Sequence, residues 1–171
     1  MQLGLKGKNA VVTGGSKGIG RSIALALAAE GVNVAICARS SGPLGETRQE
    51  IEALGVKAYA ESCDVADKTS LDGSLDHARS ELGSVDILVS NVSALGAGND
   101  LSAWDANISL DLMSTVRAVD KVLPWMKEAG SGNIIILSSI SGIEVGTTAL
   151  CRYQGRVDQL CQVAGGGSWR R

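Results

Sequence analysis

Short apolar runs alternate along the chain with longer segments that carry apolar residues at helical spacing. The apolar runs predict five strands, at residues 9–13, 32–38, 56–61, 85–89 and 133–138. The segments between them predict helices at 19–30, 44–54, 69–82 and 110–129. The last helix is expected to be interrupted or kinked near Pro124, because proline has no backbone N–H to donate.

The order of these elements predicts the fold class. Strand and helix alternate about five times, which is typical of a doubly wound α/β protein of the Rossmann type. The strands are continuous apolar runs and do not alternate with polar residues, so each is expected inside a parallel sheet that is covered on both faces.

Composition and charge indicate which partners and sites to expect, and they leave the predicted fold class unchanged. The 171 residues suit one domain, and the formal net charge of -2 gives no reason to expect nucleic acid or an anionic membrane as a partner. No apolar run is long enough to span a bilayer, and no secretory signal precedes the first strand, so a cytoplasmic protein is expected. No metal site is expected, because the four cysteines form no CxxC pair and His77 is the one histidine.

The strongest chemical signal lies between the first strand and the first helix. It reads Thr13-Gly14-Gly15-Ser16-Lys17-Gly18-Ile19-Gly20. Glycines at a strand-to-helix turn let a pyrophosphate approach the backbone, and the helix N-terminus offers it free N–H groups. The segment therefore predicts a dinucleotide site, with contacts from Gly14, Ser16, Lys17, Gly18, Ile19 and Gly20.

The spacing TGxxxGxG resembles that of the short-chain dehydrogenase/reductase family, and the resemblance runs from about Leu5 to about Gly146. By this resemblance Asp64, followed by Val65, contacts the adenine, and Asn91 stands in the family's Asn-Asn-Ala-Gly segment. The chain is also similar to the 3-oxoacyl-acyl-carrier-protein reductases of the family. The family's sheet continues with further strands, so the sheet is expected to be incomplete on its C-terminal side.

The choice of cofactor follows from charge at the end of the second strand. An NAD site places a carboxylate there for the ribose hydroxyls, whereas an NADP site needs a cation for the 2′-phosphate. The strand ends with Arg39 and no acid, and Lys17 adds a second cation in the glycine loop. We therefore expect NADP rather than NAD.

The resemblance implies hydride transfer between NADPH and a ketone or secondary alcohol, for example a 3-oxoacyl thioester. It also implies a homo-oligomer if the fold is complete. It assigns the catalytic serine to Ser139, with Ser138 and Ser141 as competing assignments, and the tyrosine to Tyr153. The relay asparagine is matched by Asp111, with Asn107 as the alternative. Four residues after Tyr153 stands Val157 in place of the family's lysine, and Arg156 is one position early.

The composition changes after Thr148 to residues such as Cys, Arg, Gln, Gly and Trp. The sequence therefore predicts a dinucleotide-binding Rossmann domain at 1–148 and an atypical tail at 149–171. A frameshift near codon 149 explains the change, since residues 150–164 can be translated back to a shifted frame that resembles the family's next helix. The alternative to an active reductase is a non-catalytic nucleotide-binding fragment or pseudoenzyme.

Overall fold

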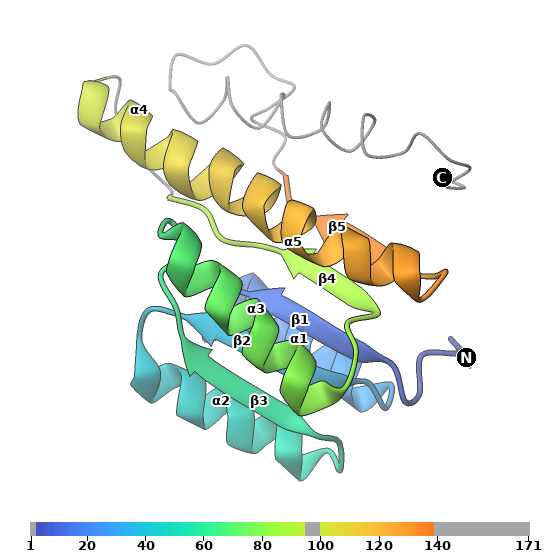
Figure 1. The fold of residues 1–171 in the computed structure, drawn as a ribbon. Helices are drawn as coiled ribbons and strands as arrows, with labels where there is room; N and C mark the ends of the chain where they lie inside the picture. Colours follow the sequence, from blue (N-terminus) through green and yellow to red (C-terminus); the bar gives the residue numbers. More distant parts are fainter. Residues whose placement is uncertain (1–2, 95–99, 139–171) are drawn as a thin grey trace.

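The computed structural model describes residues 3–94 and 100–138, and these form a five-stranded parallel sheet with helices on both faces (Figure 1). The strand order is β3-β2-β1-β4-β5, so the chain winds outward from β1 in both directions. The α/β doubly wound class is confirmed. The strands are β1 (Asn9–Thr13), β2 (Asn33–Ala38), β3 (Ala58–Ser62), β4 (Ile87–Ser90) and β5 (Asn133–Ile136).

The predicted helices are present with ends shifted by a few residues. Those before the fourth strand are α1 (Gly18–Ala29), α2 (Ser41–Ala53) and α3 (Lys68–Leu82). Those after it are α4 (Leu101–Asn107), a π-helical turn η1 (Ile108–Met113) and α5 (Ser114–Glu128). No helix within the described ranges is both long and apolar enough to cross a membrane.

Alternation along the central strand divides the core into two layers. Val11 packs with the side chains of α3 and α5, whereas Ala10 and Val12 pack with those of α1 and α2. Successive side chains of a strand point to opposite faces, so a fully apolar strand supplies both layers. This is why the continuous apolar runs of the sequence correspond to central strands.

The final helical segment differs from the prediction. It begins earlier, at Leu101, and α5 runs without a break through Pro124, so the predicted interruption there is wrong. Pro124 is exposed, so water can satisfy the backbone carbonyl that proline leaves unpaired. The departure from regular α-helix lies instead in η1, where Ser114 Oγ donates to the carbonyl of Leu110 at 2.5 Å.

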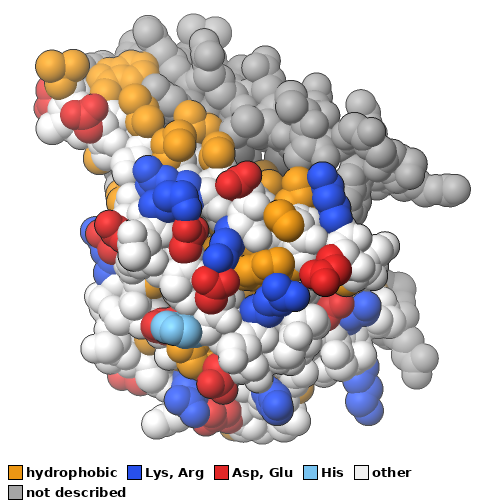
Figure 2. Space-filling view, in the orientation of Figure 1, with side chains coloured by type: hydrophobic (Ala, Val, Ile, Leu, Met, Phe, Trp, Pro, Cys, Tyr) orange, Lys and Arg blue, Asp and Glu red, His pale blue; other side chains and the backbone are white. Residues whose placement is uncertain are grey.

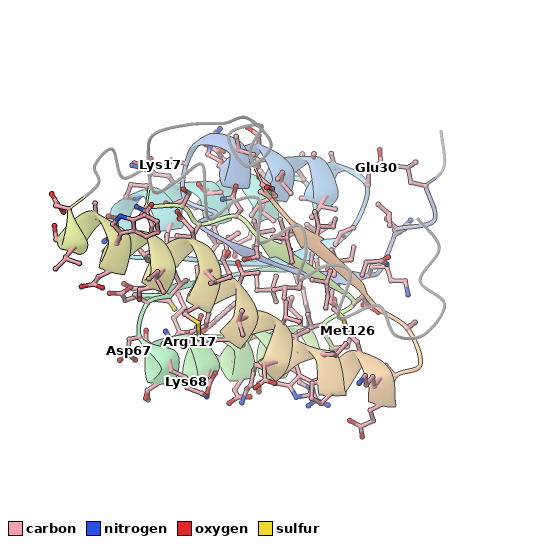
Figure 3. The ribbon with its side chains drawn as sticks, turned by 90° about the horizontal axis from the view of Figure 1, so that it is seen from above. Lys17, Glu30, Asp67, Lys68, Arg117 and Met126 are labelled. Atoms are coloured by element: carbon pink, nitrogen blue, oxygen red, sulfur yellow. The ribbon has the colours of Figure 1, made fainter. Side chains whose placement is uncertain are left out.

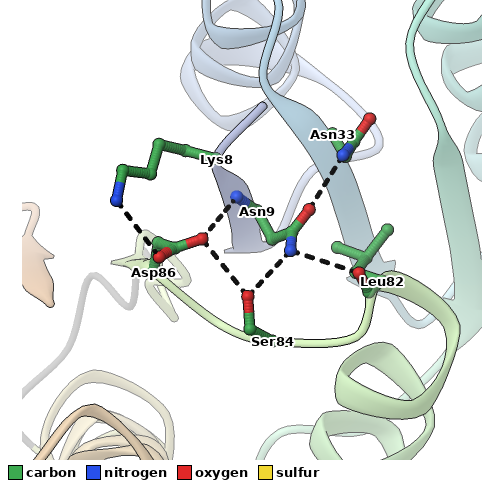
Figure 4. Close-up of polar contacts among 6 residues, drawn as sticks. All are labelled: Lys8, Asn9, Asn33, Leu82, Ser84 and Asp86. Atoms are coloured by element: carbon green, nitrogen blue, oxygen red, sulfur yellow. Dashed lines mark hydrogen bonds and ion pairs between the residues drawn. The ribbon is translucent and has the colours of Figure 1, made fainter. Parts of the chain in front are cut away.

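A polar cluster ties the amino ends of the strands together (Figure 4). The Asn9 side chain donates to the Leu82 carbonyl at 3.1 Å and to Ser84 Oγ at 2.8 Å. Its oxygen accepts from Asn33 Nδ2 at 2.9 Å, and its backbone N–H donates to Asp86 at 2.9 Å. Hydrogen bonds among the protein's own side chains and backbone therefore occupy the amino edge of the sheet.

The face of the molecule drawn in Figure 2 carries two kinds of surface. Charges of both signs are interspersed over α3 and α5, while apolar side chains gather over α4 at the upper left of Figure 2. The α3–α5 charges include the pairs Lys121–Asp76 at 2.8 Å and Arg79–Glu128 at 3.6 Å. Both cations also lie over the Trp125 ring. Exposed pairs of this kind contribute little to stability.

Candidate functional site

The carboxyl edge of the sheet brings the predicted binding residues together. β1 lies between β2 and β4, so the strand order reverses at β1, which is the switch point where ligands of α/β proteins usually bind. Figure 3 shows Lys17, Asp67 and Lys68 at this end of the layers, with Glu30 and Met126 toward the other end.

The glycine loop is held against the end of β2. The backbone N–H groups of Gly14 and Gly15 both donate to the Cys37 carbonyl, at 2.8 and 3.2 Å. Gly14 has a φ of 69° and Gly18 a φ of 56°, conformations that favour glycine. The loop therefore owes its path to glycine at these two positions.

Gly20 sets how closely α1 approaches the loop. A Cβ added there would lie 2.3 Å from the Gly14 carbonyl oxygen and 2.4 Å from Asn91 Nδ2. No side chain can occupy that space, so the start of α1 rests directly on the loop backbone. The result is a shallow cradle of backbone atoms at the helix start, which is the geometry that a pyrophosphate requires.

Asn91 fixes the loop from the other side. Its side-chain amide donates to the carbonyls of Thr13 at 3.1 Å and Gly14 at 3.4 Å, and its backbone N–H donates to Thr13 Oγ1 at 3.1 Å. Thr13 Oγ1 in turn donates to the Val89 carbonyl at 3.4 Å. Sequence reasoning did not single out Thr13, although it opens the TGxxxGxG motif.

The start of α1 differs from the starts of α3 and α4. Carboxylates cap those two helices: Asp67 accepts from the Ser70 N–H at 2.6 Å and Asp100 from the Ala103 N–H at 2.8 Å. The residue preceding α1, Lys17, makes no capping bond, and the first turn of α1 holds no acid. The positive end of the helix dipole thus faces outward without a capping anion of its own.

The side chains around this helix start suit a ligand with charged and apolar parts. Lys17 is exposed, and Ile19 is 65% exposed although it is apolar. Ser16 is buried, with its carbonyl accepting from Thr47 Oγ1 at 3.3 Å. Ser16 therefore supports the loop, while Lys17 and Ile19 are available to contact a ligand.

The ends of β2 and β3 place the remaining binding candidates at the same edge. Arg39 follows β2 and is exposed, and no ion pair within the described ranges involves it. Asp64 is exposed after β3, and its carboxylate accepts from the Ala66 N–H at 3.0 Å. Val65 is buried. Arg39 and Asp64 thus lie at the ends of neighbouring strands, both on the β2 side of the glycine loop.

Asp111 lies on η1 and is buried, with 6% of its surface exposed. One oxygen accepts from the Ala94 N–H at 2.6 Å, and the other is buried with no hydrogen-bond partner among the described residues. Desolvation by burial raises the pKa of this carboxyl above its usual value, against the lowering effect of hydrogen bonds from Ala94 and Ser93. The side-chain oxygen of Asn107, one turn earlier, is also buried with no partner in the part of the chain that the structure describes.

Several predicted catalytic residues lie outside the described residues: Ser139, Tyr153, Ser141, Arg156 and Val157. Ser138 is described and is exposed just beyond β5. Within the described ranges no group of three or more residues forms a metal-ligand set. A hollow lined by Val56, Tyr59 and Glu81 is not part of this site, because Val56 precedes β3 at the amino edge of the sheet.

Comparison with known proteins identifies a protein family that this chain matches. The family model described as short chain dehydrogenase matches residues 8–166. The match thus extends into the segment predicted to be an atypical tail. The 3-oxoacyl-[acyl-carrier-protein] reductase FabG of Staphylococcus aureus is 39% identical over 152 residues, covering 85% of this chain and 61% of that protein.

Solved structures show the same architecture with either cofactor. The NADPH-dependent 3-quinuclidinone reductase of Rhodotorula rubra superposes with a TM-score of 0.86 at 30% identity, covering 93% of this chain and 64% of that one. A 7α-hydroxysteroid dehydrogenase complexed with NADH superposes with a TM-score of 0.87 at 28% identity, covering 91% and 63%. The chain therefore spans about three fifths of the length of these relatives.

Proposed function

The chain belongs to the short-chain dehydrogenase family, and from this membership we propose that it is an NADP-dependent oxidoreductase acting on a ketone or secondary alcohol. The observation that carries the proposal is the contact of α1 with the glycine loop. A Cβ at Gly20 would meet the Gly14 carbonyl at 2.3 Å, so backbone alone forms the cradle.

The pyrophosphate of the cofactor would lie at the start of α1. That helix has neither a capping side chain nor an acid in its first turn, unlike α3 with its Asp67 cap. An anion is therefore favoured there by the free N–H groups and the helix dipole. The exposed Ile19 would cover an apolar face of the ligand.

The preference for NADP rests on charge. Arg39 and Lys17 are both exposed at the carboxyl edge, and within the described residues neither is engaged in an ion pair. β2 ends without a carboxylate that could accept from ribose hydroxyls. A guanidinium binds phosphate with two parallel hydrogen bonds, so Arg39 is the residue expected to hold the 2′-phosphate.

Bound NADPH would supply the hydride, and the chain's own residues would handle the carbonyl oxygen and the proton. Ser139 would position the carbonyl oxygen and Tyr153 would donate the proton, with Asp111 at the place of a relay group. The substrate we propose is a 3-oxoacyl thioester, supported by the likeness to the Staphylococcus aureus reductase.

A second candidate function is dinucleotide binding without turnover. The observation that favours it is chemical: Asp111 places a buried carboxylate where the family has an amide, and Val157 stands where the family has a lysine. A phenol with an ordinary pKa near 10 needs a neighbouring cation to exchange protons near neutrality. Without that cation the chain would still bind the dinucleotide but would not transfer the proton that turnover requires.

The test is a fluorescence titration of the full chain with NADPH and with NADH. We expect tighter binding of NADPH, and at least a tenfold loss of NADPH affinity in Arg39→Asp with little change for NADH. Arg48→Asp is the matched control, because Arg48 is an exposed arginine on α2 that pairs with Glu52 at 2.8 Å.

The outcomes separate the alternatives. Equal affinity for the two cofactors would show the NADP preference to be wrong, and absence of binding would show the dinucleotide site to be wrong. NADPH oxidation with a panel of 3-oxoacyl thioesters and simple ketones then decides between the two functions. Binding without turnover favours the non-catalytic function.

A further inference from the structure

Two thiols lie on one face of the sheet beside the candidate binding site. Cys37 is near the end of β2 and pairs in register with Glu61 of β3. Cys63 comes two residues after Glu61, and its N–H extends the ladder by donating to the Ala38 carbonyl at 3.0 Å. Residues two apart along a strand share a face, so Cys37 and Cys63 are diagonal neighbours. They are 3% and 2% exposed and belong to the same apolar cluster.

The two thiols lie in the same buried cluster and differ in pKa. The Cys63 sulfur accepts a hydrogen bond from Ser70 Oγ at 3.6 Å. Interaction with the neighbouring Cys37 thiol is the main cause that lowers the pKa of Cys63 to about 7, against desolvation. Interaction with Cys63, followed by burial, raises the pKa of Cys37 well above its usual value. Near neutral pH Cys63 is therefore partly thiolate, the nucleophilic form, whereas Cys37 remains a thiol.

The backbone of both cysteines is connected to the binding loop. The Cys37 carbonyl accepts the N–H groups of Gly14 and Gly15, and Cys63 directly precedes Asp64. The loop packs closely against β2, because a Cβ added at Gly15 would lie 2.5 Å from Ile36 Cγ2. Any movement of β2 at Cys37 therefore moves the loop.

We propose that Cys37 and Cys63 form a redox switch, in which a disulfide between them draws the ends of β2 and β3 together and weakens dinucleotide binding. The proposal rests on the dinucleotide function proposed above. Bonded cysteines need closer Cα atoms than diagonal strand neighbours have, so bond formation requires a backbone shift. That shift acts on Gly14, Gly15 and Asp64 through the contacts just described.

The oxidant is a small hydroperoxide such as hydrogen peroxide, because both thiols are buried from larger reagents. The Cys63 thiolate attacks one peroxide oxygen, which forms Cys63 sulfenic acid and, with one proton, releases water. Cys37 then attacks the Cys63 sulfur, its proton leaves with the hydroxyl as a second water, and the disulfide forms. Two thiols are oxidised by two electrons, and one peroxide is reduced to two waters.

The test exposes the full chain to hydrogen peroxide and measures two quantities. Mass spectrometry of a non-reduced digest should find the Cys37 and Cys63 peptides joined, 2 Da lighter than the sum of the reduced peptides. NADPH titration should show at least a fivefold loss of affinity that dithiothreitol reverses, while circular dichroism shows that the chain remains folded. The cycle from reduced to oxidised and back needs no variant.

Cys63→Ser is the matched control for oxidation elsewhere, for example at methionine. Peroxide should leave its NADPH affinity unchanged and produce no joined peptide. A joined peptide with unchanged affinity would overturn the switch, and so would a loss of affinity without the joined peptide. Failure of the reduced chain to bind any dinucleotide would instead overturn the proposed function, and the switch with it.

Discussion

β1 and β2, in the half of the molecule formed with β3, α1 and α2, are more completely buried than β5, in the half formed by β4, β5, α4 and α5. All residues of β1 are buried, whereas the residues of β5 are exposed or half-buried and Ile135 is 47% exposed. The two buried side-chain oxygens without partners within the described ranges are those of Asn107 and Asp111, both in the second half.

This difference has a physical meaning for function. The glycine loop of the first half is held by its own backbone hydrogen bonds to the Cys37 carbonyl and by side-chain bonds from Asn91, which follows β4 of the second half. The second half carries a π-helical turn and a buried carboxylate with one oxygen that has no partner among the described residues. Unsatisfied buried groups and π turns tend to occur where chemistry takes place. The residues proposed to bind the dinucleotide thus lie mainly in the first half, and Asp111, proposed as a relay group, lies in the second.

The largest effect on stability and on NADPH affinity is expected at Gly20. Gly20→Ala forces a Cβ against the Gly14 carbonyl, so we expect a loss of about 3 kcal/mol in the free energy of unfolding and more than tenfold in NADPH affinity. Gly45→Ala, also within a helix but with nothing within 4 Å, should instead be neutral or stabilise by about 0.5 kcal/mol. Urea unfolding and NADPH titration measure both, and equal effects would refute the close approach.

Asn9 tests whether the two halves unfold together. Its side chain bonds Asn33 of β2 and the Leu82–Ser84 segment before β4, so Asn9→Ala should lower the free energy of unfolding by about 2 kcal/mol. We expect a single cooperative transition in urea by fluorescence and circular dichroism. Ser102→Ala, which removes an exposed bond to Asp100, is the control and should change little. Two separate transitions would show the halves to be independent.

Asp111→Asn should raise the free energy of unfolding, whereas Asn9→Ala should lower it. It removes a desolvated charge and replaces a buried carboxylate oxygen that has no partner among the described residues, so we expect about 1 kcal/mol of stabilisation. Because burial raises the pKa of folded Asp111, the folded state binds the proton more tightly than the unfolded state. The penalty is therefore full above the raised pKa and fades as pH falls toward the ordinary aspartate value near 4.

Urea unfolding at about pH 8 and about pH 5 measures this change, and the stabilisation should be larger at the higher pH. Asp105→Asn, an exposed acid on α4, is the control and should shift stability by less than about 0.5 kcal/mol. Stabilisation that grows as pH falls would contradict the assignment.

The smallest contrast concerns the strands themselves. Ile36→Val on β2 removes a methylene from a residue 1% exposed and should destabilise the fold by about 0.8 kcal/mol. Ile135→Val on β5, at 47% exposure, should cost less than about 0.3 kcal/mol. The two melting temperatures compare the halves directly, and a larger loss at Ile135 would reverse the comparison.

The sequence predicted the strands and the first three helices because their apolar periodicity is set by burial on one or both faces of a sheet. It also identified the loop from Gly14 to Gly20, because the close contact between α1 and the loop backbone leaves no room for a side chain at Gly20. It placed Arg39, Asp64 and Asn91 correctly at strand ends, although their roles in binding stay predictions.

Tertiary structure alone decided what local pattern cannot encode. The start of the last helical segment, its π turn and the intact helix at Pro124 depend on which groups are buried and which meet water. The placement of Cys37 beside Cys63 in one buried cluster depends on residues far apart in the chain, and so does the burial of Asp111 with one oxygen that has no partner among the described residues. Periodicity fixes which face of an element is buried, whereas packing fixes the neighbours that each buried group meets.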